Sequence, residues 1–218
     1  MCEAAVHTLP VAGASLTLTS AVGHRSLLAA SDELSAHLDE LHFTLGEGPA
    51  VDAVSRGHPV LVGDLADRAT AGRWPAFSGV ATEAGVGAVF ALPLQIGAIC
   101  LGVLVAYRAE PGRLAADDLG QALRLADAAT DALLDLAAPT GEPAQHDGNG
   151  APRDNHNHPT ATYSFGAEVH QASGMLKVQL GVSIEVALAR LRAYSFAQGR
   201  PVSEIAREIV AGTLSLER

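Results

Sequence analysis

The sequence predicts an α+β protein, in which an antiparallel sheet flanked by helices is followed by a small module of three helices. Two apolar, β-rich runs follow each other closely at 85–94 and 98–107, as the strands of a hairpin do. Helical periodicity flanks this pair on both sides, and the residues after 163 show helical periodicity alone. Strands that first pair locally favour an antiparallel sheet over a doubly wound parallel one.

The first strands and their following helix have clear local signals. Residues 14–20 alternate apolar and polar side chains, which is typical of a half-buried strand, and 24–30 is a second strand candidate. Ser31 is the expected N-cap of a short helix that places the leucines at 34, 38 and 41 on one face. The segment 46–49, with two glycines and a proline, ends this helix as a tight turn.

The second half of the sheet domain is predicted from four segments. A short strand covers 59–62, and a helix covers 74–84 with Pro75 in its first turn. The two β-rich runs are joined by 95–97 and belong in the centre of the sheet. A long helix over 117–136 then carries apolar residues at 119, 123, 126, 133 and 136.

A linker and three helices complete the chain. Residues 139–162 replace the apolar pattern with prolines, glycines and polar side chains, which predicts a flexible linker. A first helix ends at Gly181, a second begins at Ser183 and ends at Gly199, and Pro201 opens a third. The inward positions are expected to be 169, 172, 176 and 180, then 184, 187, 188, 191 and 195, then 202, 205, 206 and 209.

Composition excludes several classes of protein. A 48% apolar fraction supplies a packed core and argues against global disorder. Two cysteines make a disulfide framework improbable, and Cys100 in an apolar run is expected to be a buried thiol. No apolar run approaches the length of a membrane span, so a cytoplasmic protein without membrane contact is expected. Net charge is −10, yet residues 168–218 sum to +1, so any nucleic-acid contact belongs to the tail.

No segment carries a specific catalytic or metal-binding pattern. His146, His156 and His158 lie in the linker without cysteines or an ordered scaffold, so they are interpreted as solvated. Gly46-x-Gly48 lacks the third glycine and the Lys-Ser/Thr pair of a phosphate loop. We therefore expect no enzyme, no metal and no cofactor. Trp74 is expected to pack a helix onto the sheet.

The tail resembles the ANTAR domain, a three-helix RNA-binding module of bacterial transcription antiterminators. The motifs that carry the resemblance run in order through 165–211: Gln171-Ala172-Ser173-Gly174-Met175-Leu176, Gly181-Val182-Ser183, Leu191-Arg192-Ala193-Tyr194 and Arg200-Pro201-Val202-Ser203-Glu204-Ile205-Ala206. The resemblance implies binding of RNA stem-loops by a homodimer, which favours the antiterminator RNA. The RNA-binding residues it implies are Gln171, Gly174, Lys177, Arg190, Arg192, Tyr194, Arg200 and Arg207.

The front resembles the GAF domains that precede ANTAR modules in actinobacterial regulators. The resemblance rests on residues 45–53, 62–65, 73–75 and 92–94. It implies a GAF-like sensor at 4–138, a linker at 139–162 and the ANTAR module at 163–218. The GAF part would sense an unknown small-molecule signal and control dimerisation. Residues 2–9 resemble the end of the first GAF helix, so the domain is expected to be trimmed or to start upstream.

The tail departs from the family pattern in its cations. Ser173 and Gln179 stand where basic residues are common, and 211–216 lacks the arginines of related tails. Fewer cations weaken RNA affinity and its salt dependence. Glu204 and Glu208 flank Arg207, so an ion-paired surface charge is the alternative role for that residue. One of Tyr194 and Phe196 is expected in the core, leaving the other to stack on a base.

Two other functions stay open. A dimeric module that contacts protein or DNA fits the nearly neutral tail. A GAF-type methionine sulfoxide reductase is a weaker alternative, because Cys100 is the only thiol expected in the sheet and has no evident resolving partner.

Overall fold

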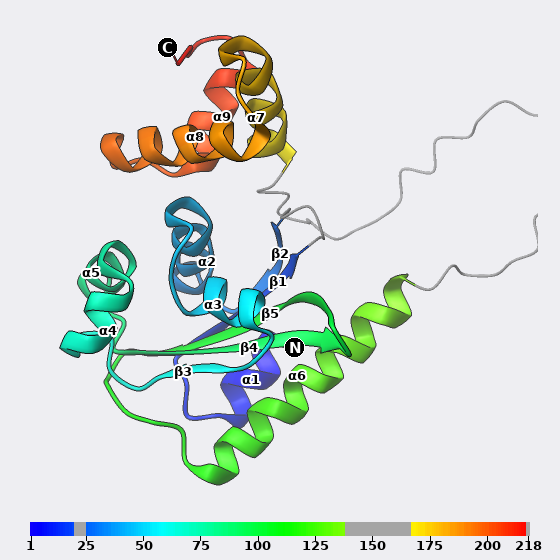
Figure 1. The fold of residues 1–218 in the computed structure, drawn as a ribbon. Coiled ribbons are helices and arrows are strands. Elements are labelled where there is room, and N and C mark those ends of the chain that lie inside the picture. Colours follow the sequence, from blue (N-terminus) through cyan, green and yellow to red (C-terminus); the bar gives the residue numbers. More distant parts are fainter. Residues whose placement is uncertain (20–24, 138–166, 217–218) are drawn as a thin grey trace, which may run out of the picture.

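The computed structural model describes residues 1–19, 25–137 and 167–216, which form a five-stranded antiparallel sheet with helices on both faces and a separate three-helix bundle (Figure 1). The predicted α+β class is confirmed. The strand order is β2-β1-β5-β4-β3. The strands are β1 (Gly13–Thr19), β2 (Arg25–Ala30), β3 (Val60–Val62), β4 (Ala88–Ile96) and β5 (Ile99–Arg108). The helices are α1 (Cys2–Thr8), α2 (Glu33–Leu45), α3 (Pro49–Arg56), α4 (Arg68–Arg73), α5 (Pro75–Glu83), α6 (Ala116–Ala137), α7 (Ala167–Leu180), α8 (Ile184–Gln198) and α9 (Val202–Val210).

The predicted hairpin forms the middle of the sheet. β4 and β5 pair antiparallel from Ala88↔Arg108 to Ile96↔Ile99, and Gly97 takes the left-handed conformation in the turn, with φ 57°. β1 lies on the other side of β5, where Gly102 is opposite Leu18. A Cβ at Gly102 would come 2.1 Å from the carbonyl oxygen of Thr17, so only glycine allows this close approach of the two backbones.

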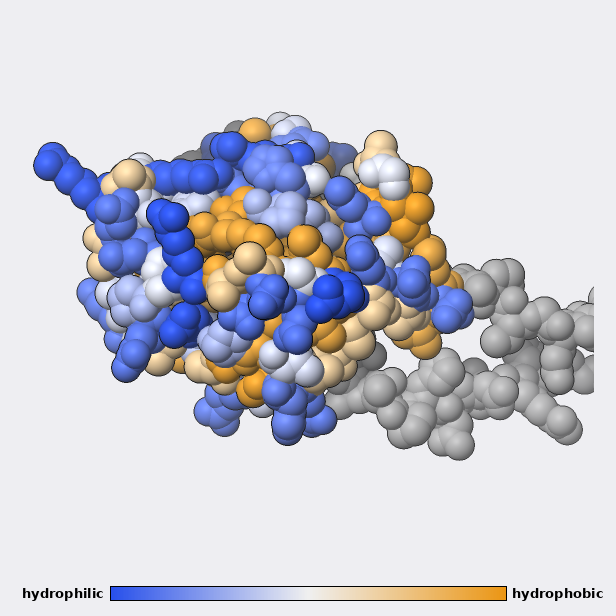
Figure 2. Space-filling model, turned by 90° about the horizontal axis from the view of Figure 1, so that it is seen from below, coloured by the Kyte–Doolittle hydropathy of each residue, from blue (hydrophilic) through white to orange (hydrophobic). Residues whose placement is uncertain are grey.

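α1 and α6 cover one face of the sheet. The buried apolar residues of α6 are Ala122, Ala126, Ala129 and Leu133, whose mostly small side chains let the helix lie close to the sheet. The predicted face was therefore partly wrong: Leu123 and Leu136 are 40% and 82% exposed. Seen from the side of α1 and α6, apolar residues are spread between hydrophilic ones over the surface (Figure 2).

α2, α3, α4 and α5 cover the opposite face. Trp74 is 3% exposed and belongs to the apolar cluster of this layer, as predicted. Two of these helices, α3 and α4, were not predicted. Pro49 opens α3 at its first turn and Gly57 ends it in the left-handed conformation, so the segment 46–49 is both a turn and the entry to a helix.

The start of α2 corrects one prediction. Its N-cap is Asp32, not Ser31, because an Asp32 carboxylate oxygen accepts the backbone N–H of Ser35 at 2.8 Å. The hydroxyl of Ser31 instead donates to the other oxygen of Asp32 at 2.6 Å. Hydrogen bonding from Ser31 and Ser35 outweighs burial and lowers the pKa of Asp32.

Several predicted segments lie outside the described residues. These are the linker 139–162, its three histidines and His24. The domain boundaries at 4–138 and 163–218 stay predictions. Within the described ranges, no single helix is long and apolar enough to span a membrane; residues 168–180 and 184–198, bent by 109°, meet that criterion only as a pair, on length and composition.

Candidate nucleic-acid interface

The candidate interface is the surface of the bundle formed by α7, α8 and α9. Leu176, Leu191 and Ile205, one from each helix, are fully buried in a common apolar cluster. The inward positions predicted for α7 and α9 are all buried. On α8 Ala187, Leu191 and Ser195 are buried and Leu188 is partly buried, but Ile184, in its first turn, is 38% exposed. This packing decides which side chains point outward.

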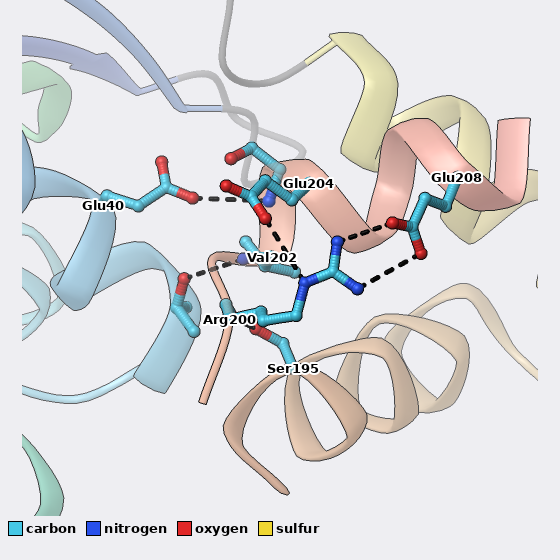
Figure 3. A network of polar contacts seen from close by, with 8 residues as sticks. Glu40, Ser195, Arg200, Val202, Glu204 and Glu208 are labelled. Carbon is cyan, nitrogen blue, oxygen red and sulfur yellow. Dashed lines mark hydrogen bonds and ion pairs between the residues drawn. The ribbon is translucent and has the colours of Figure 1, made fainter. Parts of the chain in front are cut away.

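Arg200 lies at the junction of α8 and α9 and is held by two carboxylates. Gly199 ends α8 in the left-handed conformation and turns the chain toward α9. The Nε atom of Arg200 lies 3.3 Å from Glu204 Oε2, and its Nη2 lies 2.5 Å from Glu208 Oε1 (Figure 3). Hydrogen bonding with Glu208 raises the pKa of Arg200, and the same contact lowers the pKa of Glu208. The Arg200 charge is therefore already engaged within the bundle.

Arg207 is not the partner of these glutamates. The alternative that Glu204 and Glu208 neutralise Arg207 is wrong, because positions 200, 204 and 208 align at four-residue spacing and Arg200 takes both carboxylates. Arg207 is exposed, and no ion pair within 4 Å is found for it in the described part of the chain. It lines, with Arg200, a shallow groove of about 310 Å³ along α9.

Arg192 packs against the sheet domain and is only partly exposed to solvent. Its guanidinium carbon lies 5.3 Å from the ring centroid of Phe43, which extends from α2. Burial lowers the pKa of Arg192, as does the nearby charge of Arg25. The Nε atom of Arg192 is buried without a hydrogen-bond partner in the described structure. Arg190, two positions earlier, is exposed on another face of α8, as the helical spacing predicted.

The start of α9 is capped by groups from α2. Pro201 precedes the helix and provides no side-chain cap. The backbone N–H of Val202 donates to Thr44 Oγ1 at 3.4 Å, and that of Ser203 donates to Glu40 Oε1 at 3.3 Å (Figure 3). Burial raises the pKa of Glu40, while hydrogen bonding with Ser203 opposes this effect. Two of the donors that a helix start leaves unpaired are thus satisfied by the other half of the chain.

The other predicted residues lie on α7 and α8. Gln171 and Lys177 are exposed on α7, and Gly174 between them is half-buried. A Cβ at Gly174 would meet no heavy atom within 4 Å, so packing does not explain the glycine. Tyr194 is half-buried against the bundle core, whereas Phe196 is 59% exposed. Phe196 is thus the aromatic side chain available for stacking, and sequence reasoning had placed Tyr194 in that role.

Comparison with known families identifies the two halves. A sequence model of the GAF domain matches residues 1–134, which is more than half of the chain. The chain belongs to the GAF domain family. A model of the ANTAR domain matches residues 166–210, which correspond to the three-helix bundle. No curated protein matches the chain.

Solved structures resemble the GAF domain in fold. The chain is similar to a domain described as part of a two-component sensor histidine kinase from Sinorhizobium meliloti 1021, with 22% identity, TM-score 0.51, and coverage of 63% of this chain and 88% of that one. It is similar to the GAF domain of a phosphoenolpyruvate-protein phosphotransferase from Coxiella burnetii (22% identity, TM-score 0.48, 59% and 75% covered). It is also similar to a type II free methionine-R-sulfoxide reductase from Thermoplasma acidophilum (14% identity, TM-score 0.46, 62% and 87% covered). At these identities the first likeness shows the fold alone, and the two weaker ones carry no argument.

Two rings of the GAF domain pack closely against Gly48 in the 46–49 segment. A Cβ at Gly48 would lie 2.7 Å from His42 Cδ2 and 3.0 Å from Phe77 Cδ2, so these rings occupy the space. The carboxylate of Glu47 accepts the backbone N–H groups of Ala76 and Phe77 and caps α5. A cavity of about 810 Å³ lies along β3, where Arg56, Leu61, Arg73 and Arg113 are among its lining residues.

The two cysteines differ in their exposure to solvent. Cys2 is buried, but Cys100 is only half-buried, which corrects the expectation of a buried thiol. It lies opposite Gln95, beside a register shift near the end of the hairpin. No group of three or more potential metal ligands is found among the described residues. The pairing of a GAF with an ANTAR domain favours a regulator that is not an enzyme.

Proposed function

We propose that this chain is a signal-responsive regulator that binds RNA stem-loops and promotes transcription antitermination. The observation that carries the proposal is the ANTAR match at 166–210, which coincides with a bundle packed at the predicted inward positions. The opposite net charges of the two halves support the assignment of RNA to the tail, because the acidic front repels a polyanion.

The ANTAR domain offers few free cations for this role. Lys177, Arg190 and Arg207 are exposed, Arg200 is paired with glutamates, and Arg192 is covered by α2. A single domain would therefore neutralise only a few phosphates, and its affinity would be modest. Action as a homodimer would double the number of contacts with a pair of stem-loops. Exposed Phe196 is suited to stack on an unpaired base in a loop.

The GAF domain would receive the signal. Its cavity along β3 combines arginines with apolar side chains and is large enough for a small molecule with an anionic group. Mass spectrometry of material that copurifies with the chain tests this part. Detection of a stoichiometric small molecule that is lost in an Arg113→Ala variant is the expected result.

The RNA proposal is tested by binding of a labelled RNA with two stem-loops over a salt series. We expect RNA affinity to fall as salt concentration rises. Arg190→Ala and Arg207→Ala should each reduce the slope of log affinity against log salt concentration by about 1 where the arginine contacts a phosphate. Arg124→Ala, at an exposed position of α6, makes the same charge change outside the ANTAR domain and should have no effect. Binding that ignores both salt and these variants contradicts the proposal.

A second candidate is a module that binds a protein. Exposed apolar side chains on the ANTAR domain favour it: Val178 is 82% exposed and Val186 is 44% exposed. In that case Val178→Ser would abolish partner binding in a pull-down. The RNA affinity of the wild-type chain would then not change with salt concentration.

A further inference from the structure

The two domains meet through one helix of the GAF domain, α2, which has a different role on each face. Leu38, Leu41 and His42 point into the GAF domain, where the two leucines belong to its core cluster and His42 stacks against Phe77. Phe43 is 5% exposed and belongs to the apolar cluster of the ANTAR domain. Consecutive residues of a single helix therefore belong to two different cores.

The face of α2 that meets the ANTAR domain consists of Glu40, Phe43 and Thr44, which we call the α2 clamp. Phe43 supplies the apolar anchor, and Thr44 and Glu40 cap the first N–H groups of α9. The carboxylate of Glu40 lies at the positive end of the α9 dipole, which favours an anion there. Both capping bonds are long, at 3.4 and 3.3 Å, so each contributes little to the docking.

The α2 clamp covers Arg192, a cation that the ANTAR resemblance assigns to RNA. Arg192 is placed against the ring of Phe43 and has no carboxylate partner within 4 Å in the described structure. Its buried Nε atom has no hydrogen-bond partner. Arg192 is partly exposed, and Phe43 covers one side of its guanidinium, so a phosphate can engage the whole group only after the clamp opens.

We infer that the docked arrangement excludes RNA, and that opening of the α2 clamp exposes Arg192 to a phosphate of the stem-loop. The inference rests on the proposed RNA-binding function and concerns the regulation of that site. The Glu40 carboxylate strengthens the exclusion, since it would repel a phosphate near the start of α9. Because α2 is also part of the GAF core, a ligand that displaces α2 in the GAF domain displaces the clamp as well.

The test uses the full chain with Phe43→Ala and Glu40→Gln together, which removes the anchor and the capping charge. Glu33→Gln, an exposed position at the start of α2, is the matched charge control. Hydrogen exchange at the amides of Val202 and Ser203 measures docking without RNA. We expect faster exchange at these amides and RNA binding that is about 10-fold tighter in the double variant, as loss of a buried aromatic contact typically allows.

A third variant identifies the cause of the gain. Adding Arg192→Ala to the double variant should return RNA affinity to the wild-type value or below. Unchanged exchange at Val202 and Ser203 would overturn the clamp, and faster exchange with unchanged RNA affinity would overturn the exclusion of RNA while the proposed function stands. If neither the wild type nor the opened variant binds RNA, the proposed function fails and the inference with it.

Discussion

His42 is expected to make the GAF domain sensitive to mild acid. It is fully buried, and burial, together with the charge of Arg25, lowers its pKa from 6.5 to about 3. Its Nδ1 atom is 2.7 Å from the carbonyl oxygen of Leu38, so Nδ1 carries the hydrogen and donates it. The proton would have to add at Nε2, a buried atom without a hydrogen-bond partner in the described structure.

The sign and size of the effect follow from linkage. Above pH 6.5 the imidazole is neutral in both states and its titration contributes nothing. As pH falls from 6.5 toward 3, the unfolded chain binds a proton that the folded chain does not, so stability is lost over that window. At pH 5, which is 1.5 units below the ordinary pKa of 6.5, the free energy of unfolding is lower by about 2 kcal/mol than at pH 7.

Neighbouring acids act in the opposite direction, so a matched variant is needed. Burial raises the pKa of Asp39, and its protonation in acid stabilises the folded state. His42→Asn keeps a donor for the carbonyl of Leu38 and removes the titrating group. Urea unfolding at pH 7 and pH 5, followed by the fluorescence of buried Trp74, measures the stability of the GAF domain.

The wild type should lose about 2 kcal/mol more than His42→Asn between the two pH values, whatever cavity cost the variant has at pH 7. The variant differs at a single titrating position, so the excess loss is assigned to His42. Equal losses in the two proteins would refute the argument.

Three further experiments test the packing and the charges. Gly102→Ala should prevent folding of the sheet, seen as loss of soluble protein, whereas Gly79→Ala, at an exposed position of α5, should stabilise by about 0.5–1 kcal/mol in urea unfolding. Leu191→Ala should cost about 2–5 kcal/mol and melt the bundle early by circular dichroism, while Trp74 fluorescence stays unchanged. Glu208→Gln should free Arg200 and steepen the salt dependence of RNA binding, and Glu185→Gln, with the same charge change on α8, should not.

Local signals determined most of the fold. The alternation in 14–20 and the paired β-rich runs predicted β1, β4 and β5, because these patterns are set by which face a strand buries. The glycines at 181 and 199 marked both helix ends in the bundle, since each takes the left-handed conformation there. The face of α6 was mistaken because leucine was weighted above alanine, although close contact with a sheet favours the smaller side chain.

The candidate site was less predictable, because it depends on contacts distant in sequence. Spacing alone placed Glu204 and Glu208 beside Arg207, but the turn at Gly199 brings Arg200 onto the same face. Tyr194 and Phe196 were indistinguishable as candidates until the packing of α8 showed which one is half-buried. The loss of Arg192 from the exposed set could not be predicted, since its cover comes from a helix some 150 positions earlier.

The sequence signal for the dual role of α2 can be recognised only once the core of the ANTAR domain is known. Phe43 is an aromatic residue directly after His42, so the helix carries large ring side chains on two adjacent faces. A helix that covers a sheet with one face and meets water with the other would leave a ring on its outer face exposed. Phe43 is instead buried in the ANTAR core, so the position of Arg192 depends on the same helix that packs His42 against Phe77. A change in the packing of His42 and Phe77 is therefore expected to shift Phe43 and, with it, Arg192.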